Sequence, residues 1–276
     1  MQYTMGSILS FFSRTRATQG PKPGVDYLTI RDTFRPLDLL FFNAGDLIAD
    51  SIRWLQRRNL RPGAGRFSHV GLVVTSEILD DPRLEEGKLY VWESTMSGRL
   101  TGGVLDIDGH EFLGVQLRAL DDVLVAYDRP HDACVAIARL DTKHRAELES
   151  HGMDLVQERF TSIFRRYNGT PYETNPISLV SSILRWLRCV RDNGDDGPNT
   201  HLFCSELAAR CYCDLGIFDA TRVRPENVVP EDFLGLDTDT ESDGGVPHVV
   251  DEPIVFTLYG SSSASSTSLN DAQGKQ

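Results

Sequence analysis

The chain is short of basic residues. Its 276 residues include 28 Lys and Arg against 40 Asp and Glu, which gives a formal net charge of -12 with neutral histidines. Binding to a nucleic-acid backbone depends on a basic surface that displaces counterions from the phosphates. The composition therefore argues against a nucleic-acid partner, and the acidic surface mainly favours solubility.

The sequence also lacks a long apolar run. The most apolar stretch, residues 177–190, contains Arg185 and Arg188 and is shorter than the ~20 residues that a membrane-spanning helix needs. We interpret this stretch as an amphipathic helix that lies in the core or at the surface.

Cysteine is scarce as well. The five cysteines are an odd number, they do not follow the spacing of a disulfide framework, and no secretory signal is recognisable. Disulfides persist mainly in oxidising compartments. The cysteine pattern therefore predicts free thiols and a cytoplasmic, intracellular protein.

The composition, with 40% hydrophobic residues, is that of a globular protein. We expect one domain over residues 26–259, between a flexible tail at 1–25 and a serine-rich, disordered tail at 260–276. In the first tail, residues 5–10 follow an acylation pattern if translation begins at Met5, which predicts peripheral membrane contact. A frayed terminus is the simpler interpretation.

Two kinds of hydrophobic pattern alternate along the domain. Short runs rich in apolar and β-branched residues predict strands, and the runs at 67–74 and 88–94 form a hairpin-like antiparallel pair. Apolar residues at helical spacing predict helices, and Gly216 is a good C-terminal cap for the last one. The pattern predicts an α+β domain with a central antiparallel sheet. The expected strands are 39–42, 67–74, 88–94, 114–117, 134–140 and 249–258, and the expected helices are 48–58, 153–167, 177–190 and 203–215.

Cys204 stands at the start of the last predicted helix, after a loop that contains glycine and proline. Unpaired backbone N–H groups and the helix dipole stabilise a negative charge at such a position. Cysteine nucleophiles are commonly activated in this way, and the same N–H groups can stabilise an oxyanion. The alternative interpretation is a buried cysteine that packs as a small hydrophobic residue.

His69 lies within an apolar predicted strand, where an ionisable ring needs a partner. Glu93, on the next predicted strand, is within reach across the hairpin and would orient the imidazole. Cys204, His69 and Glu93 are therefore candidates for nucleophile, base and orienting group. A structurally satisfied histidine is the alternative.

Several separated segments resemble the permuted members of the NlpC-type papain-like superfamily, which includes the YiiX-like proteins and, more distantly, lecithin retinol acyltransferase. The resemblance spans roughly residues 39–234 and follows the expected order, with histidine before cysteine, the reverse of papain. The matching segments are Gly45-Asp46-Leu47-Ile48, Phe67-Ser68-His69-Val70-Gly71, Trp92-Glu93-Ser94, Gly169-Thr170-Pro171-Tyr172, Phe203-Cys204-Ser205-Glu206-Leu207 and Val229-Pro230-Glu231-Asp232-Phe233.

The resemblance implies a circularly permuted papain-like domain with a nucleophile-bearing helix. It also implies a thiol hydrolase of the cysteine-peptidase type, or an acyltransferase, that cleaves an amide or ester bond in a peptide or acyl-lipid. Cys204 would be the nucleophile, His69 the general base and then acid, and Glu93 the third member. No metal or organic cofactor is expected. The acceptor and the oligomeric state stay open.

Other residues near these motifs have simpler interpretations. Tyr172 is a candidate substrate-binding residue or an aromatic that packs in a turn. Glu206 fits a helix cap or a salt bridge better than catalysis, and Asp46 fits a helix cap. The inserts at 101–114 and 175–199 are expected to flank the cleft.

Two rival functions remain. The first is a zinc site, because several residues of ligand type lie close together, but they form no paired Cys-x-x-Cys motif. The second is a non-catalytic binding or adaptor protein on the same scaffold. The zinc-ligand candidates are His201, Cys204, Cys211 and Cys213.

Overall fold

We analysed a computed structural model of the chain. The structure describes residues 24–43, 66–95, 104–128, 134–172, 202–235 and 246–258. These residues form a mixed α+β fold in which one seven-stranded sheet has the order β1-β7-β6-β2-β3-β4-β5. The strands are β1 (Val25–Asp26), β2 (Leu39–Asn43), β3 (His69–Val74), β4 (Tyr90–Thr95), β5 (Gly114–Ala119), β6 (Cys134–Ala138) and β7 (Ile254–Thr257).

The predicted antiparallel sheet is confirmed for six of these strands. β2 pairs antiparallel with both β3 and β6, and β4 pairs antiparallel with β3 and β5. β7 pairs antiparallel with β6 and parallel with β1. The two-residue β1 was not expected, because so short a strand leaves no alternation to detect.

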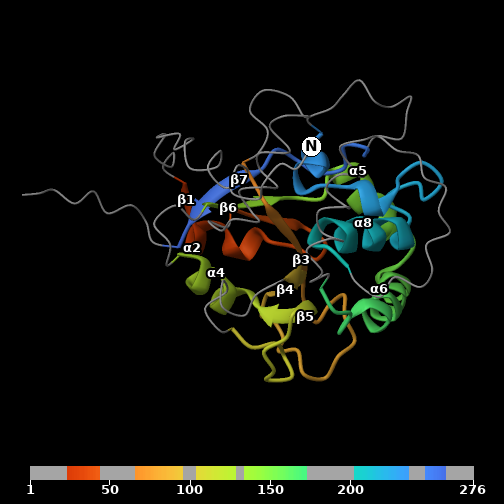
Figure 1. Ribbon diagram of the computed structural model, residues 1–276. Coiled ribbons are helices and arrows are strands. Elements are labelled where there is room, and N and C mark those ends of the chain that lie inside the picture. The colour runs from red at the N-terminus through yellow and green to blue at the C-terminus, as the bar shows by residue number, and fades with distance from the viewer. Residues whose placement is uncertain are drawn as a thin grey trace, which may run out of the picture.

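Five α-helices accompany the sheet in the described residues. Figure 1 shows α6 and α8 on one side of β3 and β4, and α2 and α4 on the other. Three short 3-10 helices are also present. The α-helices are α2 (Tyr27–Ile30), α4 (Leu120–Asp128), α5 (Thr142–Ser150), α6 (Met153–Tyr167) and α8 (Cys204–Leu215), and the 3-10 helices are η2 (Arg31–Thr33), η3 (Pro225–Asn227) and η4 (Pro230–Leu234).

The predicted helices at 153–167 and 203–215 are confirmed, and Gly216 ends α8 in the left-handed conformation at φ 80°. Three α-helices were missed, namely the four-residue α2 and the longer α4 and α5. α5 buries only Leu148, so it carries no apolar stripe, although Asp141 caps it by accepting from the backbone N–H of His144. α4 does bury residues at helical spacing. The expected helices at 48–58 and 177–190, the insert at 175–199, the first three residues of the insert at 101–114, residues 1–23 and the tail at 260–276 lie outside the described residues.

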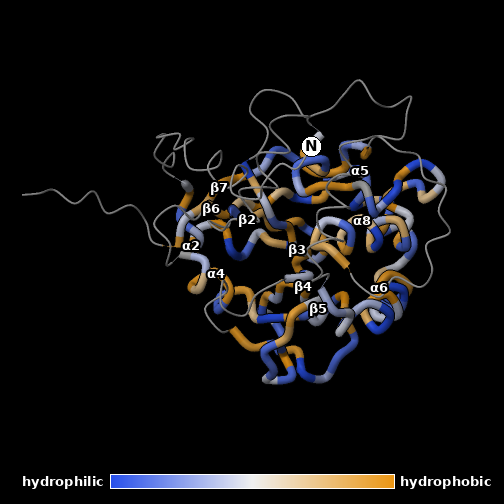
Figure 2. Tube along the Cα trace, in the orientation of Figure 1, coloured by the Kyte–Doolittle hydropathy of each residue, from blue (hydrophilic) through white to orange (hydrophobic). Residues whose placement is uncertain are grey.

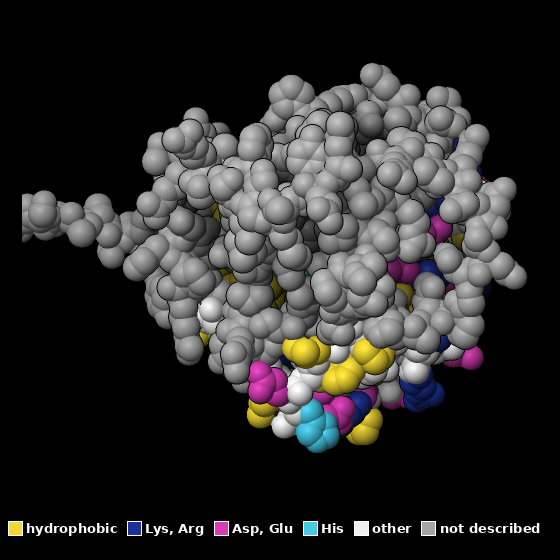
Figure 3. All heavy atoms as spheres, viewed as in Figure 1, with side chains coloured by type: hydrophobic (Ala, Val, Ile, Leu, Met, Phe, Trp, Pro, Cys, Tyr) yellow, Lys and Arg dark blue, Asp and Glu magenta, His cyan; other side chains and the backbone are white. Residues whose placement is uncertain are grey.

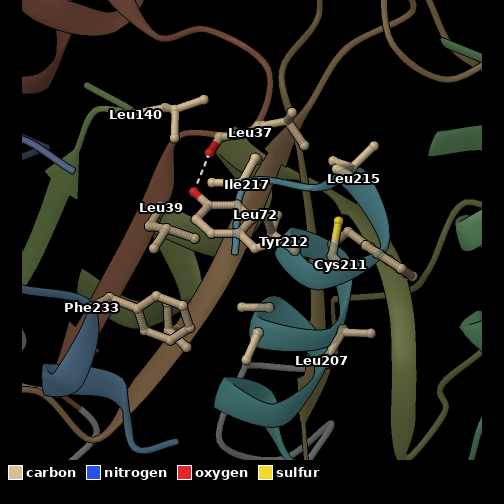
Figure 4. Close-up of a cluster of buried hydrophobic side chains, with 14 of the residues drawn as sticks. Leu37, Leu39, Leu72, Leu140, Leu207, Cys211, Tyr212, Leu215, Ile217 and Phe233 are labelled. Carbon is tan, nitrogen blue, oxygen red and sulfur yellow. Dashed lines mark hydrogen bonds between the residues drawn. The ribbon is translucent and has the colours of Figure 1, made fainter. Parts of the chain in front are cut away.

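Two apolar clusters cover the faces of the sheet. The larger one joins β2, β3 and β4 to α6 and α8, and the smaller one joins the opposite face to α2 and α4. Figure 4 shows the larger cluster, where the Tyr212 hydroxyl donates to the carbonyl of Leu37 at 2.7 Å. Hydrophobic residues run along the central strands in Figure 2. Burial of these faces is the main stabilising force of the fold.

The described part of the surface is mixed in character. In Figure 3, apolar, acidic, basic and histidine side chains stand next to one another at the lower edge of the molecule. Leu105 and Val125, both about half exposed, line a hollow of about 630 Å³ together with Arg83 and Asp122. This hollow lies between α4 and the segment before β5. Among the described residues, no helix is long and apolar enough to cross a membrane.

β3 and β4 separate at one end, and this separation positions the candidate site. Their pairing runs from Val74 only to Leu72, so the first three residues of β3 remain paired with β2 alone. The start of α8 lies against both strands at this end. The Ser94 hydroxyl on β4 donates to the carbonyl of Leu202 at 2.6 Å, which ties β4 to the segment that leads into α8.

Candidate active site

Cys204 is the first residue of α8 and is 6% exposed. The backbone N–H groups of Val70 and Ser205 are near its sulfur and lower the pKa of the thiol. The Val70 donor is available because this part of β3 has no β4 partner. The thiol therefore lies between a helix N-terminus and a strand whose edge is open, and both favour a negative charge on sulfur.

Glu206 stabilises the first turn of α8. Its carboxylate accepts from the backbone N–H of Phe203, the N-cap residue, and from Arg210 at 2.8 and 3.0 Å. Both roles expected for Glu206, the cap and the salt bridge, are present. Burial raises the pKa of Glu206, and the Arg210 guanidinium opposes that shift.

His69 opens β3 and faces both other members of the predicted triad. Its Nε2–H donates to Oε2 of Glu93, and its ring lies close enough to Cys204 for each group to shift the pKa of the other. Because Nε2 is occupied by Glu93, Nδ1 is the nitrogen left for the thiol. The ring of Phe42 on β2 packs against the imidazole, with 5.6 Å between the ring centroids. The three residues named from the sequence thus lie together.

Gly71 makes the space that Glu93 occupies. It lies between His69 and Val73 on the same face of β3, and a Cβ built there would be 2.6 Å from Cγ2 of Val91 and 3.2 Å from Cβ of Glu93. A larger residue at this position would push β4 away. The glycine in the Ser-His-Val-Gly segment is therefore a steric requirement of the site.

The charges of the three residues depend on one another. Burial lowers the pKa of His69, but the neighbouring Cys204 thiolate and Glu93 carboxylate outweigh burial and raise it to about 10. Burial raises the pKa of the Cys204 thiol, but the His69 imidazolium and the two backbone donors bring it below its usual value. Each of the two groups therefore favours the charged form of the other.

Arg118 is a fourth charged member that the sequence analysis missed. It lies on β5 with its side chain fully buried, and its guanidinium donates to Oε1 of Glu93. Burial raises the pKa of Glu93, but Arg118 and His69 outweigh it and lower the pKa to about 2. The signal was present in the sequence, since Gln116 and Arg118 alternate on the face that carries Glu93.

Glu231 is a second residue that the analysis missed. It lies in η4, is 1% exposed, and its Oε1 accepts from the backbone N–H groups of Arg66 and Phe67, the latter at 2.8 Å. These donors directly precede Ser68 and His69. Glu231 therefore fixes the approach of the chain to the histidine.

Tyr172 lies beside the start of α8. Its ring packs edge-on against Phe203 at 5.6 Å between centroids, and Tyr172 is 6% exposed. The Leu202 N–H donates to the carbonyl of Pro171 at 3.3 Å, so this turn and the start of the helix are joined. The packing matches the turn-aromatic interpretation. A role in binding substrate stays a prediction.

The remaining candidates are placed as follows. Cys211 is buried in the apolar core, Cys213 is partly buried, and the four described cysteines are free. Within the described ranges, no group of three or more His, Cys, Asp or Glu residues is arranged to hold a metal ion. Asp46 and His201 lie outside those ranges.

Comparisons with known proteins give only weak structural likeness. No family model and no curated protein matches the chain. Among solved structures, the chain is similar to the metalloprotein yiiX from Escherichia coli O157:H7, a DUF1105 protein, at 14% sequence identity and a TM-score of 0.39. The alignment covers 82% of this chain and 97% of that chain. A likeness at this level leaves the permuted papain-like topology of this chain as a prediction.

Proposed function

We propose that the protein is a cysteine-dependent hydrolase or acyltransferase that acts on an amide or ester bond. Cys204 is the nucleophile, His69 the general acid and base, and Glu93 the group that orients and charges the imidazole. The observation that carries the proposal is the position of the buried Cys204 at the N-terminus of α8, next to the His69–Glu93 pair, where His69 and Cys204 each shift the pKa of the other. In this proposal, Cys204 is a thiolate and His69 an imidazolium in the free protein, before any substrate binds.

The first half of the reaction transfers the acyl group to sulfur. The Cys204 thiolate attacks the carbonyl carbon, a C–S bond forms, and the carbonyl oxygen takes up the negative charge. Backbone N–H groups at the start of α8 stabilise developing charge in this region. The His69 imidazolium then gives its proton to the leaving amine or alcohol as the C–N or C–O bond breaks, which leaves a thioester on Cys204 and a neutral imidazole.

The second half releases the acyl group. Neutral His69 takes a proton from water, or from the amine or hydroxyl of a second substrate, and the resulting nucleophile attacks the thioester. The C–S bond breaks, and the thiolate and imidazolium are restored. Water as acceptor makes the protein a hydrolase, and another acceptor makes it an acyltransferase. The acyl donor is a peptide or an acyl-lipid, and this chemistry requires no metal or organic cofactor.

Alkylation of the wild-type protein by iodoacetamide as a function of pH tests activation without a known substrate. Peptide mapping separates the five cysteines. We expect Cys204 to react selectively, with an apparent pKa well below the roughly 8.5 of a free thiol. His69→Ala removes the imidazolium and leaves a buried thiol, so its reaction should shift to alkaline pH. His144→Ala is the matched control. His144 also pairs with a carboxylate, that of Asp141 at 2.8 Å, but this pair lies outside the site.

The acyl-enzyme provides the second test. The protein is incubated with activated esters of short and long acyl chains and with peptide esters, and its intact mass is measured after quenching in acid. A mass increase on Cys204 that is absent in Cys204→Ser supports acyl transfer. If Cys204 in the wild type reacts no faster than the other cysteines and forms no thioester, the proposal is wrong, and the non-catalytic binding protein becomes the better interpretation.

A further inference from the structure

The charged side chains of the site continue beyond Glu93. Glu93 uses one carboxylate oxygen for His69 and the other for Arg118. Cys204, His69, Glu93 and Arg118 thus form a series of alternating charge that begins on α8 and crosses β3, β4 and β5, which lie side by side in Figure 1. The charges of the series cancel as two ion pairs.

The register of the sheet explains how Arg118 reaches Glu93. On β5, Gln116 is directly opposite Glu93, and Arg118 is opposite Val91. Residues displaced by two along the neighbouring strand lie on the same face, within reach of a long side chain. The guanidinium therefore extends diagonally across β4 to the carboxylate, on the face that carries His69.

The position of Arg118 is costly for stability alone. Its side chain is fully buried, and within the part of the chain that the structure describes its Nε and Nη1 donate to no acceptor. A buried ion pair offsets the desolvation of its charges only when the remaining donors are also satisfied. An apolar pair of similar volume would stabilise the sheet as well or better. What the guanidinium supplies is a positive charge on the side of Glu93 away from His69.

From this geometry we propose that Arg118 is a positioning residue of the site, which holds Glu93 ionised and in place so that Glu93 in turn keeps His69 charged beside Cys204. The inference rests on the proposed function and adds a fourth member to its machinery. Arg118 contacts neither the nucleophile nor the acyl group, so it acts only through Glu93.

Few other ionisable groups face Glu93. β3 contributes His69, and α8 contributes Cys204 beyond it. α4 contributes Tyr127, whose ring packs on Phe42 at 4.5 Å. Two acidic residues at the start of α4 have other surroundings, because Asp121 is held by Tyr27 and Arg31, and Asp122 is exposed. In the described residues, the charge balance at Glu93 is therefore set by His69 and Arg118.

The test compares the pH profile of Cys204 alkylation in three variants. In Arg118→Met, Glu93 has lost its cation and tends to take up a proton, which weakens the His69 imidazolium. We expect the apparent pKa of Cys204 to rise by at least about one unit, which lowers the rate at acid pH about tenfold. Arg118→Lys keeps the charge and should restore most of the rate. Arg145→Met removes the cation from another buried pair, with Asp38, and should leave the profile unchanged.

A second readout follows the imidazole directly. In NMR spectra of the wild type, we expect the His69 ring to remain protonated at neutral pH, and in Arg118→Met we expect it to titrate at lower pH. A purely structural role would lower thermal stability in Arg118→Met and Arg145→Met alike without moving either the His69 titration or the alkylation profile.

If Arg118→Met does not fold, the pair Glu93→Gln and Glu93→Gln/Arg118→Met decides the question, because the double variant leaves no unpaired charge. Since Arg118 acts only through Glu93, both should show the same Cys204 profile, and a further change in the double variant would overturn the inference. An activated wild-type Cys204 with an unchanged Arg118→Met profile also overturns it and leaves the proposed function intact. An unactivated wild-type Cys204 overturns both.

Discussion

Glu93 owes its position to the missing side chain of Gly71, since a Cβ on Gly71 would lie 3.2 Å from the Cβ of Glu93. The same Cβ would lie 2.6 Å from Cγ2 of Val91, a branched side chain that cannot turn away freely. β3 therefore carries His69 and, two residues later, the glycine that leaves space for Glu93, the partner of His69.

Gly71→Ala should destabilise the protein by about 1–3 kcal/mol, because overpacking a dense core forces neighbouring atoms apart. It should also slow Cys204 alkylation, since β4 and Glu93 must move. Urea unfolding and alkylation at neutral pH measure the two effects. Val91→Ala removes the closest contact, so Gly71→Ala/Val91→Ala should lose less stability than the sum of the single variants. Additive losses would show that the contact with Val91 does not limit this position.

Glu93 makes the stability of the protein sensitive to acid. Its pKa is lowered to about 2 in the folded protein against 4.5 for a free glutamate. Its contribution is thus complete above pH 4.5 and is lost as the pH falls toward 2, at about 1.4 kcal/mol per unit. Urea unfolding at pH 7 and pH 3 should show a larger drop for the wild type than for Glu93→Gln. Equal drops in the two proteins would contradict the lowered pKa.

Glu231→Ala should reduce both the stability of the protein and the reactivity of Cys204, although Glu231 is not a member of the triad. The substitution leaves the buried N–H groups of Arg66 and Phe67 without their acceptor, which costs about 1–3 kcal/mol. His69 lies two residues beyond Phe67, so we expect slower alkylation of Cys204 as well. Glu231→Gln retains a side-chain oxygen acceptor and should lose less on both measures. If both variants keep the wild-type alkylation rate, Glu231 serves stability alone.

Tyr212→Phe should lower stability without changing the reactivity of Cys204, because Tyr212 lies in the core away from the site. The hydroxyl of Tyr212 donates to the carbonyl of Leu37 at 2.7 Å, and both residues are buried. Its removal should lower the free energy of unfolding by about 1–3 kcal/mol, because the carbonyl is left unsatisfied. Cys204 alkylation should stay at the wild-type rate. A parallel loss of reactivity would mean that alkylation reports general loosening of the fold.

The residues that the sequence predicts well are those whose position follows from local pattern. α8 was predicted from Leu207, Cys211 and Leu215 at spacings of four and from Gly216 as its end, and the structure agrees on both. His69 and Glu93 were paired because a hairpin brings alternate residues of neighbouring strands onto one face. In the structure they lie on that face, although β3 and β4 no longer pair at that end.

Other features were missed. A strand was expected only to Leu117, although the alternation of polar and apolar residues continues through Arg118 to Ala119, so Arg118 was left out of the sheet. Glu231 bonds to residues more than 160 positions earlier, and such a contact leaves no trace in spacing. α5 has an almost uniformly polar sequence and was missed because its one buried leucine forms no stripe. Its Asp141 cap was the available signal.

The parallel pairing of β1 with β7 places Val25 opposite Phe256, so the first and last strands of the described domain are neighbours at one edge of the sheet. A linker of a few residues between Gly24 and Leu258 would bridge them. New ends could then be opened at the exposed His151–Gly152 turn between α5 and α6. The rewired chain would run through Cys204 before His69, while the strands and the helix that hold the two residues keep their places. The order of Cys204 and His69 along the chain is thus independent of their arrangement in space.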